Sequence, residues 1–590
     1  MNNNKYELGG WSLEDLFPSQ TSPEMGAAVE ELEKKAERFE TRRDSLTDRI
    51  SHSDFLEIIQ ELESIITLSY QIHSFASLQF AADTQNQDGQ AFLSRVDQLM
   101  AEMQNRVLFF SLWWKALEEE TADKLVEGTG DYRYWLEEMR HFRPHTLSEP
   151  EEKVINLKDV TGSSALTKLY DTITNRYVFS LDVDGEKKQL TRGQIMVYAR
   201  DPDPKMRAGA YQEIYRVFGQ DGQILGQIYQ ALVRDWFNEQ VQLRHYKTPI
   251  SARNLVNDVP DSVVDTLLEV SERNADIFQR FFKLKAGLIG VDQLRRYDIY
   301  APVEKSDKSY EFDQGVKMVM DSFAAFDHGF KRMAQRVFDE RRLDSEVRKG
   351  KRDGAFCATV TPDLTPWVLV NFQGRAEDVA TLSHEFGHAI HSMLAEEHSV
   401  FTQNASLPLA ETASTFAEML LVDYMLANES DEGVRRDILF RQVDDAYATI
   451  MRQIYFALFE RQAHDMVAKN ASVEELSEAY LVNLETQFGG AVALSDEFRW
   501  EWVSIPHIYH VPFYVYAYAF GQLLVLSLYQ QYKTVGLEAF KPRYLEILSA
   551  GGSASPEVVL KRAQVDIHNP EFWQGGYDVL RNMISELEKL

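Results

Sequence analysis

The residues best suited to chemistry lie at 384–388, where two histidines stand four positions apart and a glutamate follows the first. On a helix, positions four apart share a face, with about 5–6 Å between Cβ atoms, so His384 and His388 can reach one metal ion. Glu385 points about 100° round from His384, beside the position where a base for a bound water is required. The pattern predicts a hydrolytic metal site. An amphipathic helix with two unrelated histidines is the alternative.

Such a site needs a third protein ligand. A third histidine at position 394 is excluded because that residue is Leu394, and the remaining common arrangement takes a carboxylate from a second helix. Glu411 and Glu418 lie two turns apart among small and apolar residues, where buried carboxylates need partners. We predict that Glu411 binds one Zn²⁺ ion and that Glu418 holds a ligand imidazole by its other N–H. A solvated or salt-bridged Glu418 is the alternative.

These residues resemble a known family. The run His384-Glu385-Phe386-Gly387-His388, the tetrad Glu411-Thr412-Ala413-Ser414 and then Glu418 are similar to the thimet-oligopeptidase family of zinc peptidases, specifically its bacterial oligoendopeptidase F branch. Segments 366–374 and 505–518 carry further matches. The resemblance implies a mostly helical peptidase of two halves enclosing a channel, with short oligopeptides as substrates.

The segment 507–518 contains two histidines and four tyrosines. Peptide hydrolysis develops negative charge on the carbonyl oxygen, which hydrogen-bond donors beside the metal stabilise. His507, His510 and Tyr514 are the candidate donors, with His507 and Tyr514 predicted to be catalytic. His510 and Tyr509 are also predicted to contact substrate. Spacing alone does not decide which tyrosine faces the metal among Tyr509, Tyr514, Tyr516 and Tyr518.

A strand pattern precedes the metal-binding helix. Residues 367–372 are rich in β-branched and aromatic side chains, and Gly374 and Asp378 open the helix that follows. Chiefly from the resemblance, we predict an edge strand that binds the peptide through its main chain as an added strand. A strand that only packs is the alternative. The predicted substrate-binding residues are Trp367, Val368, Leu369, Val370 and Asn371.

The rest of the chain predicts a mainly α fold with a small β-sheet beside the metal-binding helix. From Ser22-Pro23 to Phe39, apolar residues recur at spacings of four and three, which is typical of an amphipathic helix. Asp184-Gly185 marks the turn of a hairpin near 177–190. We expect an N-terminal helical domain over 1–200, which includes this hairpin, and a catalytic domain over 201–590.

Composition excludes several classes of function. The 590 residues carry a formal net charge of −30, which argues against binding to nucleic acid or anionic membranes. No apolar run approaches the roughly 20 residues of a membrane span, and the start lacks the pattern of an export signal. The single cysteine, Cys357, rules out an internal disulfide. A reducing compartment, and hence a cytoplasmic location, is expected.

The sequence thus predicts a zinc-dependent endopeptidase that cleaves short oligopeptides, with Glu385 as general base. Two alternatives remain open. A zinc carboxypeptidase or dipeptidase on a similar helical framework would need a cationic group for the substrate's terminal carboxylate. A catalytically silent peptide-binding protein would keep the helices without the chemistry.

Overall fold

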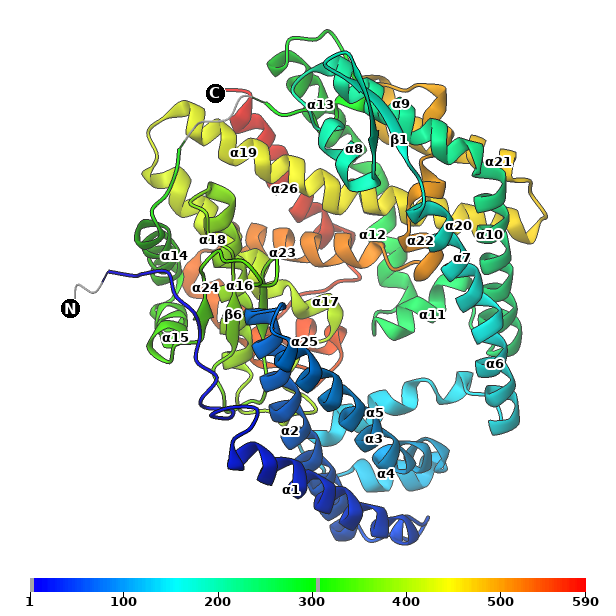
Figure 1. Ribbon diagram of the computed structural model, residues 1–590, viewed down its shortest axis with the longest axis vertical. Helices are drawn as coiled ribbons and strands as arrows, with labels where there is room; N and C mark the ends of the chain where they lie inside the picture. Colours follow the sequence, from blue (N-terminus) through cyan, green and yellow to red (C-terminus); the bar gives the residue numbers. More distant parts are fainter. Residues whose placement is uncertain (1–4, 304–307) are drawn as a thin grey trace. The chain divides into compact units, whose positions relative to one another are not determined.

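The computed structural model describes residues 5–303 and 308–590, which divide into two compact units (Figure 1). The first unit contains residues 5–143, 308–429 and 531–566, and the second contains 144–303, 430–530 and 567–590. Both units are mainly helical, as predicted. The predicted boundary near residue 200 falls inside the second unit, and the two-domain assignment stays a prediction. Among the described residues, none of the helices combines the length and the apolar character needed to cross a membrane.

The first unit begins with a helical bundle, whose helices α1 to α3 run together at the blue end of the chain in Figure 1. α1 begins where the sequence predicts, because the Ser22 hydroxyl accepts a hydrogen bond from the Met25 amide and Pro23 occupies the first turn. Its apolar face from Met25 to Phe39 is buried. The helices of this unit are α1 (Pro23–Glu40), α2 (His52–Ala82), α3 (Gln87–Ala116), α4 (Glu119–Val126), α5 (Tyr132–His141), α14 (Phe312–Phe326), α15 (His328–Asp339), α16 (Ala376–Leu394), α17 (Leu407–Ala410), α18 (Thr412–Asn428), α24 (Leu537–Ser549) and α25 (Pro556–Arg562).

A small sheet packs against α16, as predicted, but the strand that precedes α16 does not lie at its edge. The order is β4-β6-β5, formed by β4 (Leu343–Asp344), β6 (Trp367–Leu369) and β5 (Phe356–Ala358). β6 pairs in parallel with β4 and antiparallel with β5. The prediction of an edge strand within residues 367–372 is therefore wrong, because its paired part, β6, lies in the centre of the sheet. Both edges of β6 are already paired, so no substrate strand can be added there.

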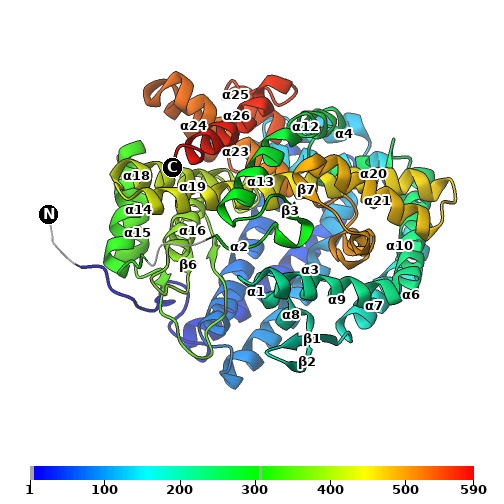
Figure 2. The same ribbon diagram turned by 90° about the horizontal axis from the view of Figure 1, so that it is seen from above.

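The second unit contains the predicted hairpin, formed by β1 (Phe179–Val183) and β2 (Glu186–Leu190). Its turn places Asp184 and Gly185 at φ 57° and 81°, the left-handed region that such two-residue turns require. Figure 2 shows the hairpin beside α8 and α9. The helices of this unit are α6 (Glu149–Thr161), α7 (Ser163–Asn175), α8 (Arg192–Tyr198), α9 (Pro204–Gln220), α10 (Gly222–Trp236), α11 (Pro249–Val256), α12 (Asp261–Arg273), α13 (Ala275–Leu288), α19 (Glu432–Ala446), α20 (Arg452–Ala468), α21 (Val473–Phe488), α22 (His507–His510), most of α23 (Tyr516–Val535) and α26 (Pro570–Leu587). A parallel pair of short strands, β3 (Leu294–Arg295) and β7 (Val492–Ala493), completes it.

Candidate active site

Helix α16 carries both histidines of the predicted site. Its first turn is capped by Asp378, whose carboxylate accepts hydrogen bonds from the amides of Gln373 and Arg375 at 2.8 and 2.9 Å. The carboxylate also complements the positive end of the helix dipole. Two turns further on, His384 and His388 project from the same face, with ring centroids 4.9 Å apart.

Gly387 allows the backbones of α16 and α18 to come into direct contact. A Cβ atom at this position would lie 2.5 Å from the Cα of Ser414 and 2.7 Å from the carbonyl oxygen of Ala413, closer than any ordinary contact. Only glycine fits between the two helices at this crossing. The close approach brings Glu411, at the start of α18, to the histidine face of α16.

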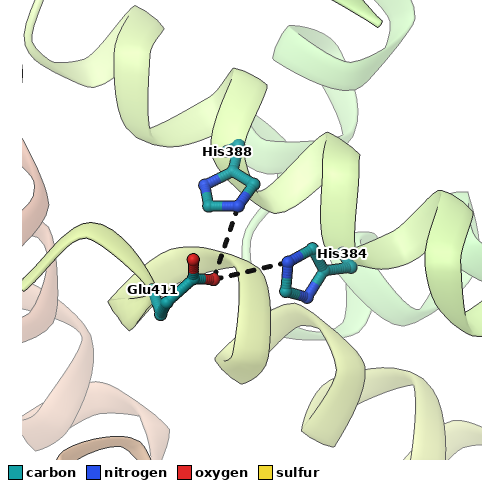
Figure 3. A group of neighbouring side chains, drawn as sticks. All are labelled: His384, His388 and Glu411. Atoms are coloured by element: carbon teal, nitrogen blue, oxygen red, sulfur yellow. Dashed lines mark ion pairs between the residues drawn. The ribbon is translucent and has the colours of Figure 1, made fainter. Parts of the chain in front are cut away.

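Three side chains of these elements converge on one point (Figure 3). The Glu411 Oε2 atom lies 3.3 Å from His384 Nε2 and 3.4 Å from His388 Nε2. The three candidate ligand atoms all lie within 4.8 Å of one another. A tetrahedral zinc ion with bonds of about 2.0–2.1 Å separates its ligand atoms by about 3.3–3.4 Å, so the two measured distances suit such an ion.

Glu418 and Ser414 form hydrogen bonds with two members of this group, His384 and Glu411. The Nδ1 atom of His384 donates to the Glu418 carboxylate at 2.6 Å, which leaves Nε2 facing Glu411. The Ser414 hydroxyl donates to Glu411 Oε2, also at 2.6 Å. The sequence predicts the contact of Glu418 with a ligand imidazole but not the role of Ser414. The serine's position one turn after Glu411 was the available signal.

The electrostatics of the group favour a positive charge at its centre. Burial disfavours the charged form of His384, but hydrogen bonds to the carboxylates of Glu411 and Glu418 raise its pKa to about 10. Partial burial disfavours the carboxylate of Glu411 too, yet its hydrogen bond with His384 and its proximity to His388 lower its pKa to about 2. Two imidazoles and a carboxylate held in such a field are suitable ligands for a divalent cation.

Glu385 lies beside this group and is 6% exposed. Burial, together with the negative charges of Glu411 and Glu418, raises its pKa to about 7. A cavity of about 490 Å³ within the first unit is lined by Glu385, both histidines and Glu411. Its other walls include β5 and residues 403–405. A carboxylate with this pKa can exchange a proton with a molecule in the cavity near neutral pH.

Residues 367–370, which contain β6, lie away from solvent. Trp367, Val368 and Leu369 are fully buried, and Val370 is 2% exposed. The amides of Val368 and Val370 donate to the carbonyls of residues 342 and 344 at 2.9 Å, so they have no free donors for a peptide. Asn371 donates to the carbonyls of residues 352 and 354, which holds the loop before β5. The prediction that Trp367, Val368 and Leu369 bind substrate by adding a strand is therefore wrong, because both edges of β6 are paired. Val370 is buried and its amide is also paired. The predicted contact of Asn371 with substrate stays a prediction.

Two of the four candidate tyrosines belong to the core of the second unit. Tyr509 is 2% exposed, its ring stacks on Tyr170 at 3.8 Å, and its hydroxyl donates to the carbonyl of residue 225. Tyr516 is 1% exposed and bonds to Asn257 through its hydroxyl. The prediction that Tyr509 contacts substrate is therefore wrong, because its polar atom and both ring faces are covered.

The remaining candidates of this segment are more accessible: His507, His510 and Tyr518 are exposed, and Tyr514 is partly buried. The rings of His507 and Tyr514 are nearly parallel, with centroids 6.4 Å apart, and Tyr518 meets both edge-on. Burial lowers the pKa of His507, which favours the neutral imidazole. His510 pairs through Nε2 with Asp171 at 2.9 Å. The burial of Tyr509 and Tyr516 therefore leaves Tyr514 and Tyr518 as the tyrosines that could donate a hydrogen bond to a substrate.

Comparison with known proteins adds an independent line of evidence. Residues 197–579 match the profile of "Peptidase family M3", and residues 113–179 match that of "Oligopeptidase F". The chain is 27% identical to Oligopeptidase PepF of Bacillus subtilis over 592 residues, which cover 98% of this chain and 87% of that protein. It is 28% identical to the chromosomal Oligoendopeptidase F of Lactococcus lactis subsp. cremoris over 593 residues, covering 98% and 97% of the two chains.

Solved structures share the fold. A Chlamydophila abortus protein superposes with a TM-score of 0.88 at 23% identity, with 98% of each chain covered. The oligoendopeptidase-F of Enterococcus faecium gives a TM-score of 0.69 at 24% identity, with 96% of this chain and 98% of that chain covered. At these identities the likeness concerns the fold alone.

Proposed function

This chain belongs to peptidase family M3, in its oligoendopeptidase F branch, and we infer that His384, His388 and Glu411 hold the zinc ion on which its peptidase activity depends. The chain is a metalloendopeptidase that hydrolyses oligopeptides. The observation that carries the ligand assignment is the convergence of the three ligand atoms at separations of 3.3 and 3.4 Å. A bound zinc ion supplies Lewis-acid polarisation of the scissile carbonyl and a water molecule acidified to a pKa of about 7.

The protein's own groups would perform the proton transfers. Glu385 lies next to His384 on α16 and lines the same cavity. Its carboxylate takes a proton from the attacking water and delivers it to the amine of the leaving peptide. The pKa of about 7 suits both steps, because the group is then neither too weak a base nor too weak an acid near neutral pH. Glu418 keeps the His384 ring in the orientation that presents Nε2 to the ion.

Substrate binding is proposed for β5 in place of β6. β5 is an edge strand of its sheet, and no strand of the described residues pairs with its outer side. Phe356 and Cys357 of this strand line the cavity that contains the metal group. A peptide extended along this edge would bond through its main chain, which accommodates many side-chain sequences.

His507 and Tyr514 are proposed as donors to the oxygen that becomes negatively charged. A neutral imidazole and a phenol are suitable for this task, and removing one such donor typically costs about 10²–10³ in turnover. The support is chemical, together with the elimination of Tyr509 and Tyr516 by their burial. A cytoplasmic location is likewise proposed, from the single cysteine, Cys357.

The test combines metal analysis with mapping of cleavage sites. Purified protein is expected to contain one zinc ion per chain. It should also cleave internal bonds of a peptide whose two ends are both chemically blocked. Glu385→Gln should retain the zinc and lose nearly all turnover, because the amide has no proton-accepting carboxylate. An intact blocked peptide would point to an exopeptidase, and activity retained in Glu385→Gln would refute the base assignment.

A further inference from the structure

The orientation of the Glu411 carboxylate is less restrained by packing than that of the two imidazoles. Its side chain is 48% exposed, whereas those of His384 and His388 are 28% and 25% exposed. Packing alone therefore restrains the carboxylate less than it restrains the two rings. A carboxylate with this freedom can rotate either of its oxygens away from the rings.

The Ser414 hydroxyl provides the restraint. Its Oγ atom lies 2.6 Å from Glu411 Oε2 and 3.1 Å from the main-chain oxygen of Glu411. Oε2 is the same oxygen that approaches both imidazoles. The serine side chain is fully buried, so its hydroxyl has no water as an alternative partner.

The backbone that carries this hydroxyl is itself held firmly. The Cα atom of Ser414 lies in the close crossing with Gly387. The Tyr544 hydroxyl donates to the carbonyl of Thr412 at 3.0 Å, which anchors the same helical turn to α24. A firmly held donor thus faces a half-exposed carboxylate, and the hydrogen bond restrains the orientation of Glu411 relative to the helix crossing.

We propose that Ser414 is a positioning residue that holds Oε2 of Glu411 toward His384 and His388, so that the carboxylate presents a single oxygen to the ion. This inference rests on the proposed zinc site. A catalytic metal site keeps one position open for water or substrate, and a carboxylate that turns to offer both oxygens would occupy it. Ser414 therefore acts on metal affinity and on the open position, without contacting the substrate.

The experiment measures zinc affinity of the full chain by competition with a chelator. Ser414→Ala removes the hydroxyl and adds no atom at the Gly387 contact, and it is expected to weaken zinc binding about 10–100-fold. The visible spectrum of the cobalt-substituted variant should also change, because the coordination of the ion changes. Ser414→Thr, which retains a hydroxyl, should restore most of the affinity.

Ser383→Ala is the matched control. The Ser383 side chain is also fully buried on the same helix pair, but its hydroxyl donates to the carbonyl of Ala417 at 3.0 Å and not to Glu411. It should keep the wild-type zinc affinity. Equal affinities of Ser414→Ala and the wild type would overturn the inference, and so would equal losses in both alanine variants. A wild-type protein that binds no zinc would instead overturn the proposed function, and the inference with it.

Discussion

Replacement of Gly387 by alanine tests the link between helix packing and the metal group. The added Cβ would lie 2.5 Å from the Ser414 Cα, whereas ordinary contacts begin near 3.4 Å, so α16 and α18 must separate by about 1 Å. Metal sites tolerate changes of only about 0.2 Å in ligand distance. We expect overpacking to destabilise the fold by about 1–3 kcal/mol and zinc affinity and kcat each to fall by about 10²-fold.

The sign of the stability change distinguishes this reasoning from helix propensity. Alanine is favoured over glycine inside a helix by about 0.5–1 kcal/mol, so propensity alone predicts a more stable variant. Gly26→Ala in α1 is the control, because Gly26 is exposed and its Cβ would meet nothing within 4 Å. Thermal unfolding and chelator competition on both variants provide the comparison. A Gly387→Ala protein with wild-type melting temperature, zinc affinity and kcat would refute the packing argument.

Three further predictions concern the site and its surroundings. Glu418→Gln should weaken zinc binding about 10–100-fold in chelator competition, because the imidazole that it holds loses a charged partner. Tyr514→Phe and His507→Ala should each lower kcat about 10²–10³-fold with little change in KM, and an unchanged kcat would remove that residue from the mechanism. Hydrogen bonding to Asp131 raises the pKa of His398 above its ordinary 6.5, while hydrogen bonds from His398 and its neighbours outweigh burial and lower the pKa of Asp131 to about 2. Asp131 therefore contributes its full stabilisation above its ordinary pKa of 3.8, and His398 contributes its full stabilisation below its ordinary pKa of 6.5. Asp131→Asn should lower the melting temperature most between about pH 4 and 6.5, where both contributions are present. A decrease in melting temperature that does not depend on pH would contradict this.

Local features of the fold were predictable from the sequence because their causes are local. The start of α1 follows from a capping serine and a proline in the first turn. The hairpin turn at Asp184-Gly185 follows from the backbone angles that these residues accept. The central position of β6 in its sheet could not be predicted in this way. It depends on pairing with β4, which is only two residues long and carries no sequence signal of its own.

The sequence by itself determined which side chains can act on a metal ion. Helical periodicity places His384 and His388 on one face, and this geometry holds wherever the helix lies. Only the tertiary structure decided that Glu411 approaches both rings through one oxygen, and that Ser414 contacts that same oxygen. These facts depend on how closely two helices cross, which is set by long-range packing that a residue pattern does not encode.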